Sequence, residues 1–205
     1  MVNQFPPLTP FDQHNRFLES NVHPSDWKNP PPASNYHLVV IGAGTAGLVT
    51  AAAAAGLGAR VALIESDLMG GDCLNVGCVP SKSLIAASRF IATEQRGKKM
   101  GISNHENPSI NFSEIMERMR KQRSQISPMD SAKRFQELGV DVFFGRGSFI
   151  DDQTVSIHSP NEPATQLKFK KAVIASGARA KIPDIEGLDQ VNFLTNETLF
   201  SITEL

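Results

Sequence analysis

The stretch from residue 36 to residue 65 limits the fold of this 205-residue chain more than any other part of it. Residues 36–41, YHLVVI, form a short apolar run of the kind found in buried parallel strands. A glycine-rich turn, an alanine-rich segment over 45–57 and a second apolar run over 60–65 follow in that order. Strand, helix and strand in this order predict a βαβ unit, so we expect an α/β fold of the Rossmann type with a parallel sheet.

The turn after the first expected strand has the sequence GAGTAG over residues 42–47, which matches G-x-G-x-x-G. In such a turn Gly42 permits the tight bend, Gly44 lets the backbone approach a pyrophosphate, and Gly47 lets helix and strand pack closely. Thr45 and Ala46 open the helix, whose free N–H groups and partial positive charge attract phosphates. The alternative is a glycine-rich turn that serves packing alone, but the surrounding βαβ pattern favours a dinucleotide site.

An acidic residue ends the second apolar run, because Glu65 follows Gly47 by 18 residues. A carboxylate at this point accepts hydrogen bonds from the hydroxyl groups of an adenosine ribose. Its negative charge also disfavours a 2′-phosphate on that ribose. The pattern therefore predicts FAD or NAD as the ligand rather than NADP.

Both cysteines of the chain, Cys73 and Cys78, lie in the segment GGDCLNVGCVPSK over residues 70–82. Residues five apart in one helix are separated by about 7.5 Å along its axis and point in different directions, so they cannot form a disulfide. We therefore expect Cys73 to lie before a regular helix that begins near Cys78, with Gly77 allowing the chain to curl. A helix N-terminus favours the thiolate form of Cys78. Together the two residues predict a dithiol that opens and closes.

Other interpretations of this segment stay open. A zinc site usually needs four ligands, and the five histidines of the chain are scattered. Two inert, buried thiols are a further alternative. Lys82 lies one turn beyond Cys78 on the same face of the expected helix, where its ammonium group would face whatever the thiolate faces. A solvated surface lysine is the alternative for Lys82.

Residues 1–36 contain seven of the thirteen prolines and show no sustained periodicity, which is typical of an extended arm. We expect a short helix from Asp12 to Ser20, with Asp12 as its N-cap and with Phe17 and Leu18 in an apolar contact. Trp27 is expected to anchor the arm to the rest of the protein. A mobile tail is the alternative.

The second half of the chain predicts further helices and short strands. Helices are expected over residues 80–94 and 111–138, the second one broken at Pro128 and ended by Gly139. From residue 140 the apolar period changes to two, and the runs 142–144, 148–150 and 154–157 predict an antiparallel excursion of short strands. A last apolar strand is expected over 168–175, and Ser176-Gly177 follows it.

Charge and composition exclude several functional classes. With 20 basic and 21 acidic residues, the chain has no electrostatic reason to bind nucleic acid or an anionic membrane surface. Residues 38–59 carry no charge, but their alanine and glycine content argues against a membrane span. The start of the chain lacks the pattern of a secretory signal, and two cysteines are too few for a disulfide-stapled scaffold. We therefore expect a cytoplasmic protein.

The glycine fingerprint, Glu65 and the cysteine segment together resemble the FAD domain of the pyridine nucleotide-disulfide oxidoreductases, especially mercuric reductase and dihydrolipoamide dehydrogenase. The resemblance implies a hydride passed from NAD(P)H to FAD and then to a Cys73–Cys78 disulfide. It further implies that Cys78 lies next to the flavin, that Cys73 meets the substrate, and that Lys82 lies near the reactive edge of the flavin.

Two further segments carry the resemblance less closely. Ala175, Ser176 and Gly177 resemble the Ala-Thr-Gly motif with which the family passes the FAD. Gly71 and Asp72 precede the first cysteine beside the cofactor, but the family commonly has threonine at the position of Asp72. A carboxylate next to a pyrophosphate is repulsive unless it points away or finds a cation.

The resemblance runs from about residue 37 to the end, so we expect an arm over 1–36 and an FAD-binding domain over 37–205. Family members are considerably longer, with a second glycine fingerprint for NAD(P)H and an interface domain that supplies a His-Glu pair from the other subunit. These features imply the N-terminal portion of a homodimeric enzyme that reduces mercuric ion or a small disulfide such as lipoamide. A non-catalytic FAD-binding or thiol-switch module is the alternative.

Overall fold

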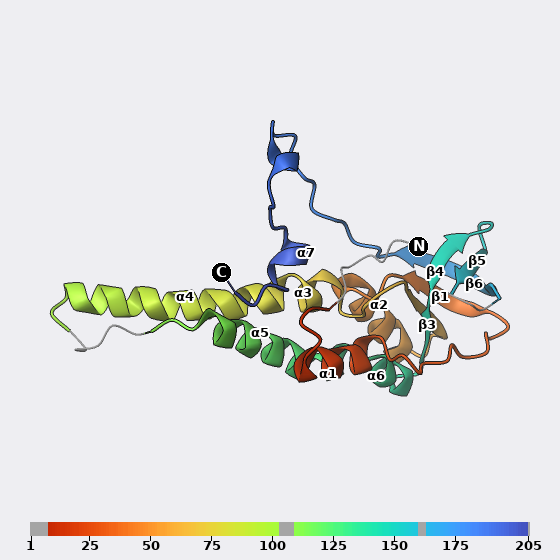
Figure 1. Cartoon of the computed structure of the whole chain (residues 1–205). Coiled ribbons are helices and arrows are strands. Elements are labelled where there is room, and N and C mark those ends of the chain that lie inside the picture. Colours follow the sequence, from red (N-terminus) through yellow and green to blue (C-terminus); the bar gives the residue numbers. More distant parts are fainter. Residues whose placement is uncertain (1–7, 103–108, 160–162, 205) are drawn as a thin grey trace.

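The computed structural model describes residues 8–102, 109–159 and 163–204. Within these ranges six strands form one sheet in the order β3-β2-β1-β6-β5-β4 (Figure 1). Their bounds are β1 Tyr36–Ile41, β2 Val61–Glu65, β3 Val140–Phe144, β4 Arg146–Phe149, β5 Thr154–His158 and β6 Thr165–Ile174. The expected α/β class with a parallel sheet and a small antiparallel part is confirmed.

One half of the sheet is parallel. Strand β1 lies between β2 and β6, and β3 extends the sheet beyond β2, with parallel pairing throughout. Every residue of β2 is buried, which explains its continuous run of apolar residues. The predicted strands over 36–41 and 60–65 and the intervening helix are therefore confirmed. The uncharged stretch over 38–59 is divided between β1 and that helix, and no described helix is long and apolar enough to cross a membrane.

The expectation of an antiparallel excursion from residue 142 onward is wrong for its first strand. Strand β3 pairs parallel with β2, because helices connect the two strands and a crossover of this kind returns the chain in the same direction. Strands β4, β5 and the first part of β6 are antiparallel, as predicted. Residues 165–168 of β6 pair with β5, and its later residues pair with β1, so β6 joins the two halves of the sheet.

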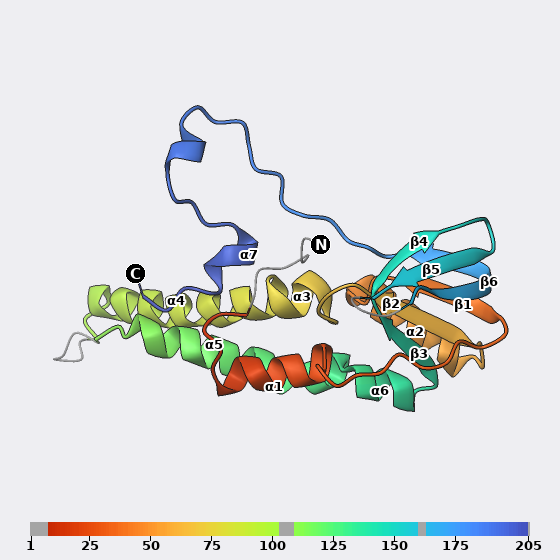
Figure 2. The ribbon, with the colours of Figure 1, turned by 45° about the vertical axis from the view of Figure 1, so that its right-hand side comes forward.

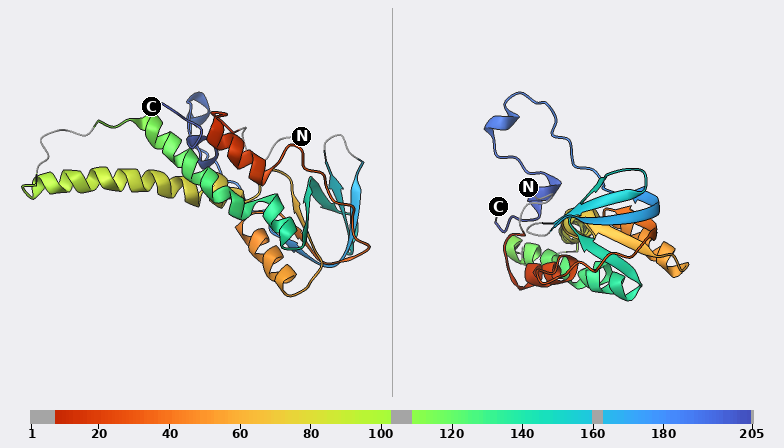
Figure 3. Two further views of the ribbon diagram at one scale, coloured as in Figure 1. Left: turned by 90° about the horizontal axis from the view of Figure 1, so that it is seen from below. Right: turned by 90° about the vertical axis from the view of Figure 1, so that its right-hand side faces the viewer.

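Helices occupy one side of the parallel strands. Their bounds are α1 Gln13–Val22, α2 Thr45–Gly56, α3 Gly71–Asn75, α4 Cys78–Lys99, α5 Phe112–Ile126, α6 Ala132–Glu137 and α7 Asn196–Leu199, with short 3-10 turns at η1 Ser127–Asp130 and η2 Leu188–Gln190. Helices α4 and α5 lie side by side and extend away from the sheet (Figure 1, Figure 3). The predicted break at Pro128 is confirmed, since η1 separates α5 from α6. Gly139 follows α6 with a φ of 83°, as expected of a residue that ends a helix.

Two apolar cores cover the two faces of the parallel strands. On one face Val40 and Leu63 pack with side chains of α1, α2, α5 and α6. On the other face Val39 and Ile64 pack with Val155 and other residues of the antiparallel strands, which lie over β1 to β3 (Figure 2). Alternate residues of each strand thus enter different cores, as the pleat of a strand requires.

The described part of the N-terminal arm is packed against this body. Asp12 caps α1 as predicted, because its carboxylate accepts hydrogen bonds from the N–H groups of His14 and Asn15 at 3.0 and 2.9 Å. The helix continues to Val22, two residues beyond the expected end. Leu18 is buried as expected, but the contact predicted for Phe17 is wrong, since Phe17 is 51% exposed on the other side of the helix.

Polar side chains of the arm cover the edge of the sheet at β3. Trp27 donates from Nε1 to the carbonyl of Val142 at 3.2 Å, which confirms its role as an anchor. Asn29 donates to the carbonyl of Phe144 at 2.9 Å and accepts from the N–H of Phe144 at 2.8 Å. The arm thus pairs backbone groups that an edge strand would otherwise leave free. The division into an arm over 1–36 and an FAD-binding domain over 37–205 stays a prediction.

Removing the side chain of Asn29 should lower the stability of the chain measurably. In Asn29→Ala the buried N–H of Phe144 loses its acceptor, so we expect the free energy of unfolding to fall by about 1–3 kcal/mol. Urea denaturation of the 205-residue chain measures this change. Lys28→Ala, at the exposed neighbouring position, serves as the control and should lie within about 0.5 kcal/mol of the parent. Equal stability of the two variants would contradict the proposed role of Asn29.

Candidate functional site

A cleft of about 260 Å³ lies at the carboxyl ends of the parallel strands. Its lining includes residues of all three predicted motifs: Gly42, Gly44, Thr45, Ala46, Glu65, Gly71, Asp72, Cys73, Ala175, Ser176 and Gly177. Glycine fingerprint, cysteine segment and the end of β6 therefore meet at one place. This edge of an open α/β sheet is where ligands bind in such folds.

Three residues predicted for the site do not line the cleft. Gly47 lies beneath it, where a Cβ atom would come within 1.8 Å of the Gly42 carbonyl oxygen. Cys78 is exposed as the first residue of α4. Lys82 is exposed one turn further along the same helix.

Several residues that line the cleft are not predicted as site residues from the sequence: Ile41, Ile64, Ser66, Leu68, Gly145, Gly147 and Ala178. A signal existed for Gly145 and Gly147, because both follow closely on an apolar strand. That strand was expected to be antiparallel, which would have placed its carboxyl end at the opposite edge of the sheet. Parallel pairing of β3 with β2 brings both glycines beside Glu65 instead.

Gly71 and Gly44, which both line the cleft, differ in the space that the protein leaves for a Cβ atom. Gly71 has a φ of 54°, and a Cβ atom there would lie 2.7 Å from the Cα of Gly44, so the start of α3 touches the fingerprint turn directly. A Cβ atom on Gly44 would meet nothing closer than 3.7 Å. The protein therefore leaves space for a Cβ atom beside Gly44, a residue that lines the cleft. That room fits a pyrophosphate held close to the backbone.

Glu65 ends β2 and is buried. One carboxylate oxygen accepts from the N–H of Ala43 at 2.6 Å, and the other accepts from the N–H groups of Ser66 and Asp67 at 2.8 and 2.9 Å. Burial raises the pKa of the Glu65 carboxyl above its usual value, while these three donors oppose the rise. The carboxylate thus joins the fingerprint turn to the end of the neighbouring strand.

Asp72 lies at the start of α3 near a cation from another part of the chain. Arg179 donates to both carboxylate oxygens of Glu197 at 2.8 and 2.6 Å, and its charge also acts on Asp72. Burial and the charge of Glu197 raise the pKa of the Asp72 carboxyl, and Arg179 opposes the rise. Of the two arrangements expected for Asp72, a side chain that points away or one with a cation, the charge of Arg179 supports the second, although Arg179 pairs directly with Glu197.

The segment that carries Arg179 and Glu197 leaves the sheet after β6 and returns at α7, which lies near α3 and α4 (Figure 1, Figure 2). Asn196 of α7 donates to the carbonyl of Val76 at 3.5 Å, and Phe200 is buried in the helical core. The segment thus packs through α7 and Phe200 against the residues that follow α3 and against the helical core.

The two cysteines are free thiols that lie close enough for Cys78 and the side chain of Thr45 to act on the ionisation of Cys73. Burial and the contact with Cys78 raise the pKa of the Cys73 thiol, while Thr45 lowers it. Cys73 lies before α4 as predicted, but in a short helix of its own, α3, rather than in irregular chain. Among the described residues no cluster of three or more His, Cys, Asp or Glu side chains is arranged to hold a metal ion.

The family model for pyridine nucleotide-disulphide oxidoreductases matches residues 36–203, which is most of the chain. The chain belongs to this family. Members are oxidoreductases that use a flavin and a pyridine nucleotide, and the fingerprint, Glu65 and the cysteine pair lie in the matched region. The recognition made from the residues is thus confirmed.

Individual relatives carry two different names. A mercuric reductase of Staphylococcus aureus is 30% identical over 83% of this chain and 30% of its own length. A dihydrolipoyl dehydrogenase of Bacillus subtilis is 35% identical over 75% of this chain and 32% of its own length. The chain thus spans about a third of the length of such relatives.

A solved structure supports the fold. A copper(II) complex of the HOCl-induced flavoprotein disulfide reductase RclA from Escherichia coli, in a cysteine-to-serine mutant, superposes with a TM-score of 0.68. The sequences are 24% identical, and the match covers 84% of this chain and 36% of the other. At this identity the likeness concerns the fold.

Because Gly71 contacts Gly44, we expect that forcing the start of α3 away from the fingerprint turn lowers the free energy of unfolding. Gly71→Ala forces a Cβ atom against backbone, so we expect it to destabilise the chain by about 1–3 kcal/mol more than a matched control. Gly58→Ala is that control, because Gly58 also has a positive φ of 82° but no atom within 4 Å of its Cβ position. Urea denaturation compares the two variants, and equal losses would mean that α3 moves away from the fingerprint without resistance.

Proposed function

We propose that this chain is the flavin-binding part of an enzyme that transfers electrons from NAD(P)H through FAD to the Cys73–Cys78 pair, as in mercuric reductase. The observation that carries the proposal is the place of Cys73 in the lining of the cleft, with the thiol of Cys78 near enough to raise the pKa of Cys73. A dithiol next to a dinucleotide cleft is what a disulfide-reducing flavoprotein needs. A packing role would not require both of the chain's thiols to meet there.

The residues of the cleft fit FAD. Gly42, Gly44 and the N-terminus of α2 at Thr45 would hold the pyrophosphate, and Glu65 would accept from the adenosine ribose. The backbone over 175–177 borders the same cleft and would pass along the cofactor. When bound, FAD supplies a carrier that accepts a hydride from NAD(P)H and delivers two electrons to a disulfide.

The protein's own contribution is the chemistry of the two sulfurs. Two electrons and two protons convert a Cys73–Cys78 disulfide into two thiols. For a disulfide substrate such as lipoamide, a Cys73 thiolate would attack the substrate disulfide and release one substrate thiol, and Cys78 would attack Cys73 to release the second and close the pair again. For mercuric ion, closing the same dithiol would release two protons and the two electrons that reduce the ion to the metal. The raised pKa of the Cys73 thiol disfavours its thiolate, so its attack needs a proton acceptor.

The resemblance of the motif supports unequal roles, with Cys78 and Lys82 towards the flavin and Cys73 towards the substrate. This assignment rests on the resemblance alone, since Cys73 lines the cleft whereas Cys78 is exposed outside its lining. We further propose that the full-length enzyme is a cytoplasmic homodimer, and that its substrate is mercuric ion. Lipoamide is the second candidate substrate, favoured by the 35% identity to a dihydrolipoyl dehydrogenase.

Glu65→Ala should weaken FAD binding by about 1–3 kcal/mol, because hydrogen bonds to a charged acceptor are lost. Quenching of flavin fluorescence on titration with the 205-residue chain measures the affinity. Glu137→Ala, at an exposed carboxylate of α6, is the control and should bind like the parent. Unchanged affinity in Glu65→Ala would remove Glu65 from the ribose site.

Cys73→Ser and Cys78→Ser in the full-length enzyme should each lower NAD(P)H-dependent turnover about a hundredfold or more, because a serine cannot form the disulfide. Assays with mercuric ion and with lipoamide in parallel decide between the two substrates. Ser81→Ala is the matched control on α4. Cys78→Ser should also abolish the long-wavelength absorbance of a thiolate lying against the flavin. Full activity in either serine variant would refute the redox pair and favour a non-catalytic FAD-binding module.

A further inference from the structure

The described part of the N-terminal arm, residues 8–35, precedes the region that matches the family. It is nevertheless built into the domain. Helix α1 packs along α5, with Leu18 and Val22 fully buried in the helical core (Figure 3). Besides its contacts with α5, η1 and β3, this arm reaches the segment that leads to Cys73.

Two contacts join the end of α1 to the loop between β2 and α3. The N–H of Met69 donates to the carbonyl of Val22 at 3.1 Å, and Nδ1 of His23 has a hydrogen bond with the carbonyl of Asp67. The N–H of the next residue, Gly70, donates to the carbonyl of Ala43 in the fingerprint turn at 2.8 Å. The arm and the fingerprint thus hold the loop from two sides immediately before α3.

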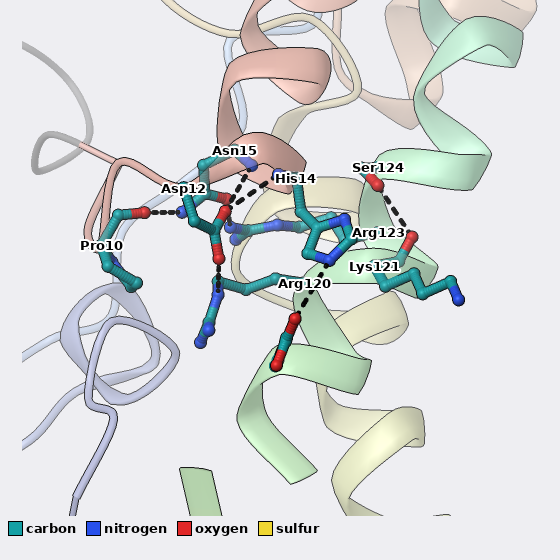
Figure 4. Close-up of polar contacts among 9 residues, drawn as sticks. Pro10, Asp12, His14, Asn15, Arg120, Lys121, Arg123 and Ser124 are labelled. Carbon is teal, nitrogen blue, oxygen red and sulfur yellow. Dashed lines mark hydrogen bonds and ion pairs between the residues drawn. The ribbon is translucent and has the colours of Figure 1, made fainter. Parts of the chain in front are cut away.

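A third contact reaches the other end of α3 through a side chain of α5. Arg123 donates from Nη1 to the carbonyl of Asn75, the last residue of α3, at 2.7 Å. The same guanidinium donates from Nη2 to Oδ1 of Asn15 on α1 at 2.6 Å (Figure 4). One planar cation therefore links the arm to the helix that carries Cys73.

Both links of Arg123 are buried. Arg123 is 3% exposed and Asn15 is fully buried, and the side-chain amide of Asn15 donates to the carbonyl of Pro10 at 2.7 Å. Close by, Arg120 donates to Asp12 at 2.6 Å, which ties the start of α1 to α5 (Figure 4). Burial and the neighbouring Arg120 lower the pKa of Arg123 to about 10, so the guanidinium is still charged at neutral pH.

A buried charge that loses a hydrogen-bond acceptor is costly, so Arg123 holds both of its acceptors in place. Among the described residues two buried donors, Arg120 Nη1 and Arg123 Nε, and one buried acceptor, Asn75 Oδ1, have no hydrogen-bond partner, so the two hydrogen bonds that Arg123 does make hold its guanidinium between α1 and α3. The position of α3 is thereby coupled to the position of α1. Arg123 does not contact either sulfur, so its influence on them acts through α3.

We propose that the N-terminal arm positions α3 through the link Asn15–Arg123–Asn75, and so sets how readily Cys73 forms a disulfide with Cys78. The inference rests on the proposed function of these cysteines as a redox pair. Asn15 and Arg123 are positioning residues in this scheme. Closing the pair removes two electrons and two protons, which oxidised glutathione takes up as it becomes two molecules of reduced glutathione.

The test is the equilibrium constant for disulfide closure in the full 205-residue chain, measured in buffers of reduced and oxidised glutathione. Alkylation followed by mass spectrometry counts the free thiols. In Asn15→Ala the looser α3 should lower the constant at least fivefold, which is a rise of about 20 mV in the reduction potential. Ser20→Ala removes an exposed hydrogen bond of the same helix and should match the parent.

Two further variants separate positioning from general stability. Asn15→Asp keeps an acceptor for Arg123 but loses the hydrogen bond that the Asn15 amide donates to Pro10, so the parent constant expected for this variant assigns the effect to the Arg123 link. Arg123→Lys keeps the charge but lacks the planar fork that reaches both acceptors, so it should lower the constant as Asn15→Ala does. In the Arg123→Lys background Asn15→Ala should have no further effect, because both act through one link. If Asn15→Ala does not fold, the comparison of Asn15→Asp with Arg123→Lys carries the test.

A constant within twofold of the parent in both Asn15→Ala and Arg123→Lys would overturn the proposal, even if both variants melt at lower temperature. Independent, additive effects of the two substitutions would overturn it as well. A parent chain whose cysteines never close would instead refute the redox function proposed above. In that case the rate of Cys73 alkylation tests the arm, and equal rates in parent and Asn15→Ala would overturn the positioning role.

Discussion

The close approach of two backbone segments at Gly44 and Gly71 holds the candidate site together. Any side chain at Gly71 would collide with the Cα of Gly44, so the fingerprint turn and the start of α3 touch without intervening atoms. This contact brings Cys73 to the same cleft as Thr45, the first residue of α2, whose side chain lowers the pKa of the Cys73 thiol. The dinucleotide cleft and the dithiol are therefore one structure, because moving either segment would open both.

Buried polar groups explain why the arm belongs to the same structure. Two guanidinium groups lie in the interior of the helical layer, those of Arg120 and Arg123, and Arg120 is paired with a carboxylate from the arm, Asp12. Charged groups in the interior are tolerated when they are paired or hydrogen-bonded. The arm supplies these partners from a part of the chain that precedes the family region, and it thereby supports the segment on which the chemistry depends.

The predictions from sequence succeeded where the signal is local. The N-cap at Asp12, the start of a helix at Cys78 and the end of a strand at Glu65 each follow from a few neighbouring residues. The predictions failed where packing against a distant part of the chain decides the strand direction or the buried face of a helix. Strand β3 pairs parallel because of the helices that precede it, and Phe17 faces outward because α1 buries its other side. Because β3 was expected to be antiparallel, Gly145 and Gly147, which follow it and line the cleft, were not predicted as site residues.

The sequence by itself determined which chemical groups form the candidate site: a glycine turn, a carboxylate at a strand end, and two thiols in one short segment. Only the tertiary structure decided which residues from distant parts of the sequence lie near these groups. Arg179 near Asp72 comes from beyond the sheet, and Asn15 meets Arg123 across 108 residues of sequence. Periodicity and capping act within a few residues, whereas contacts of this kind depend on how whole elements pack, so no local pattern encodes them.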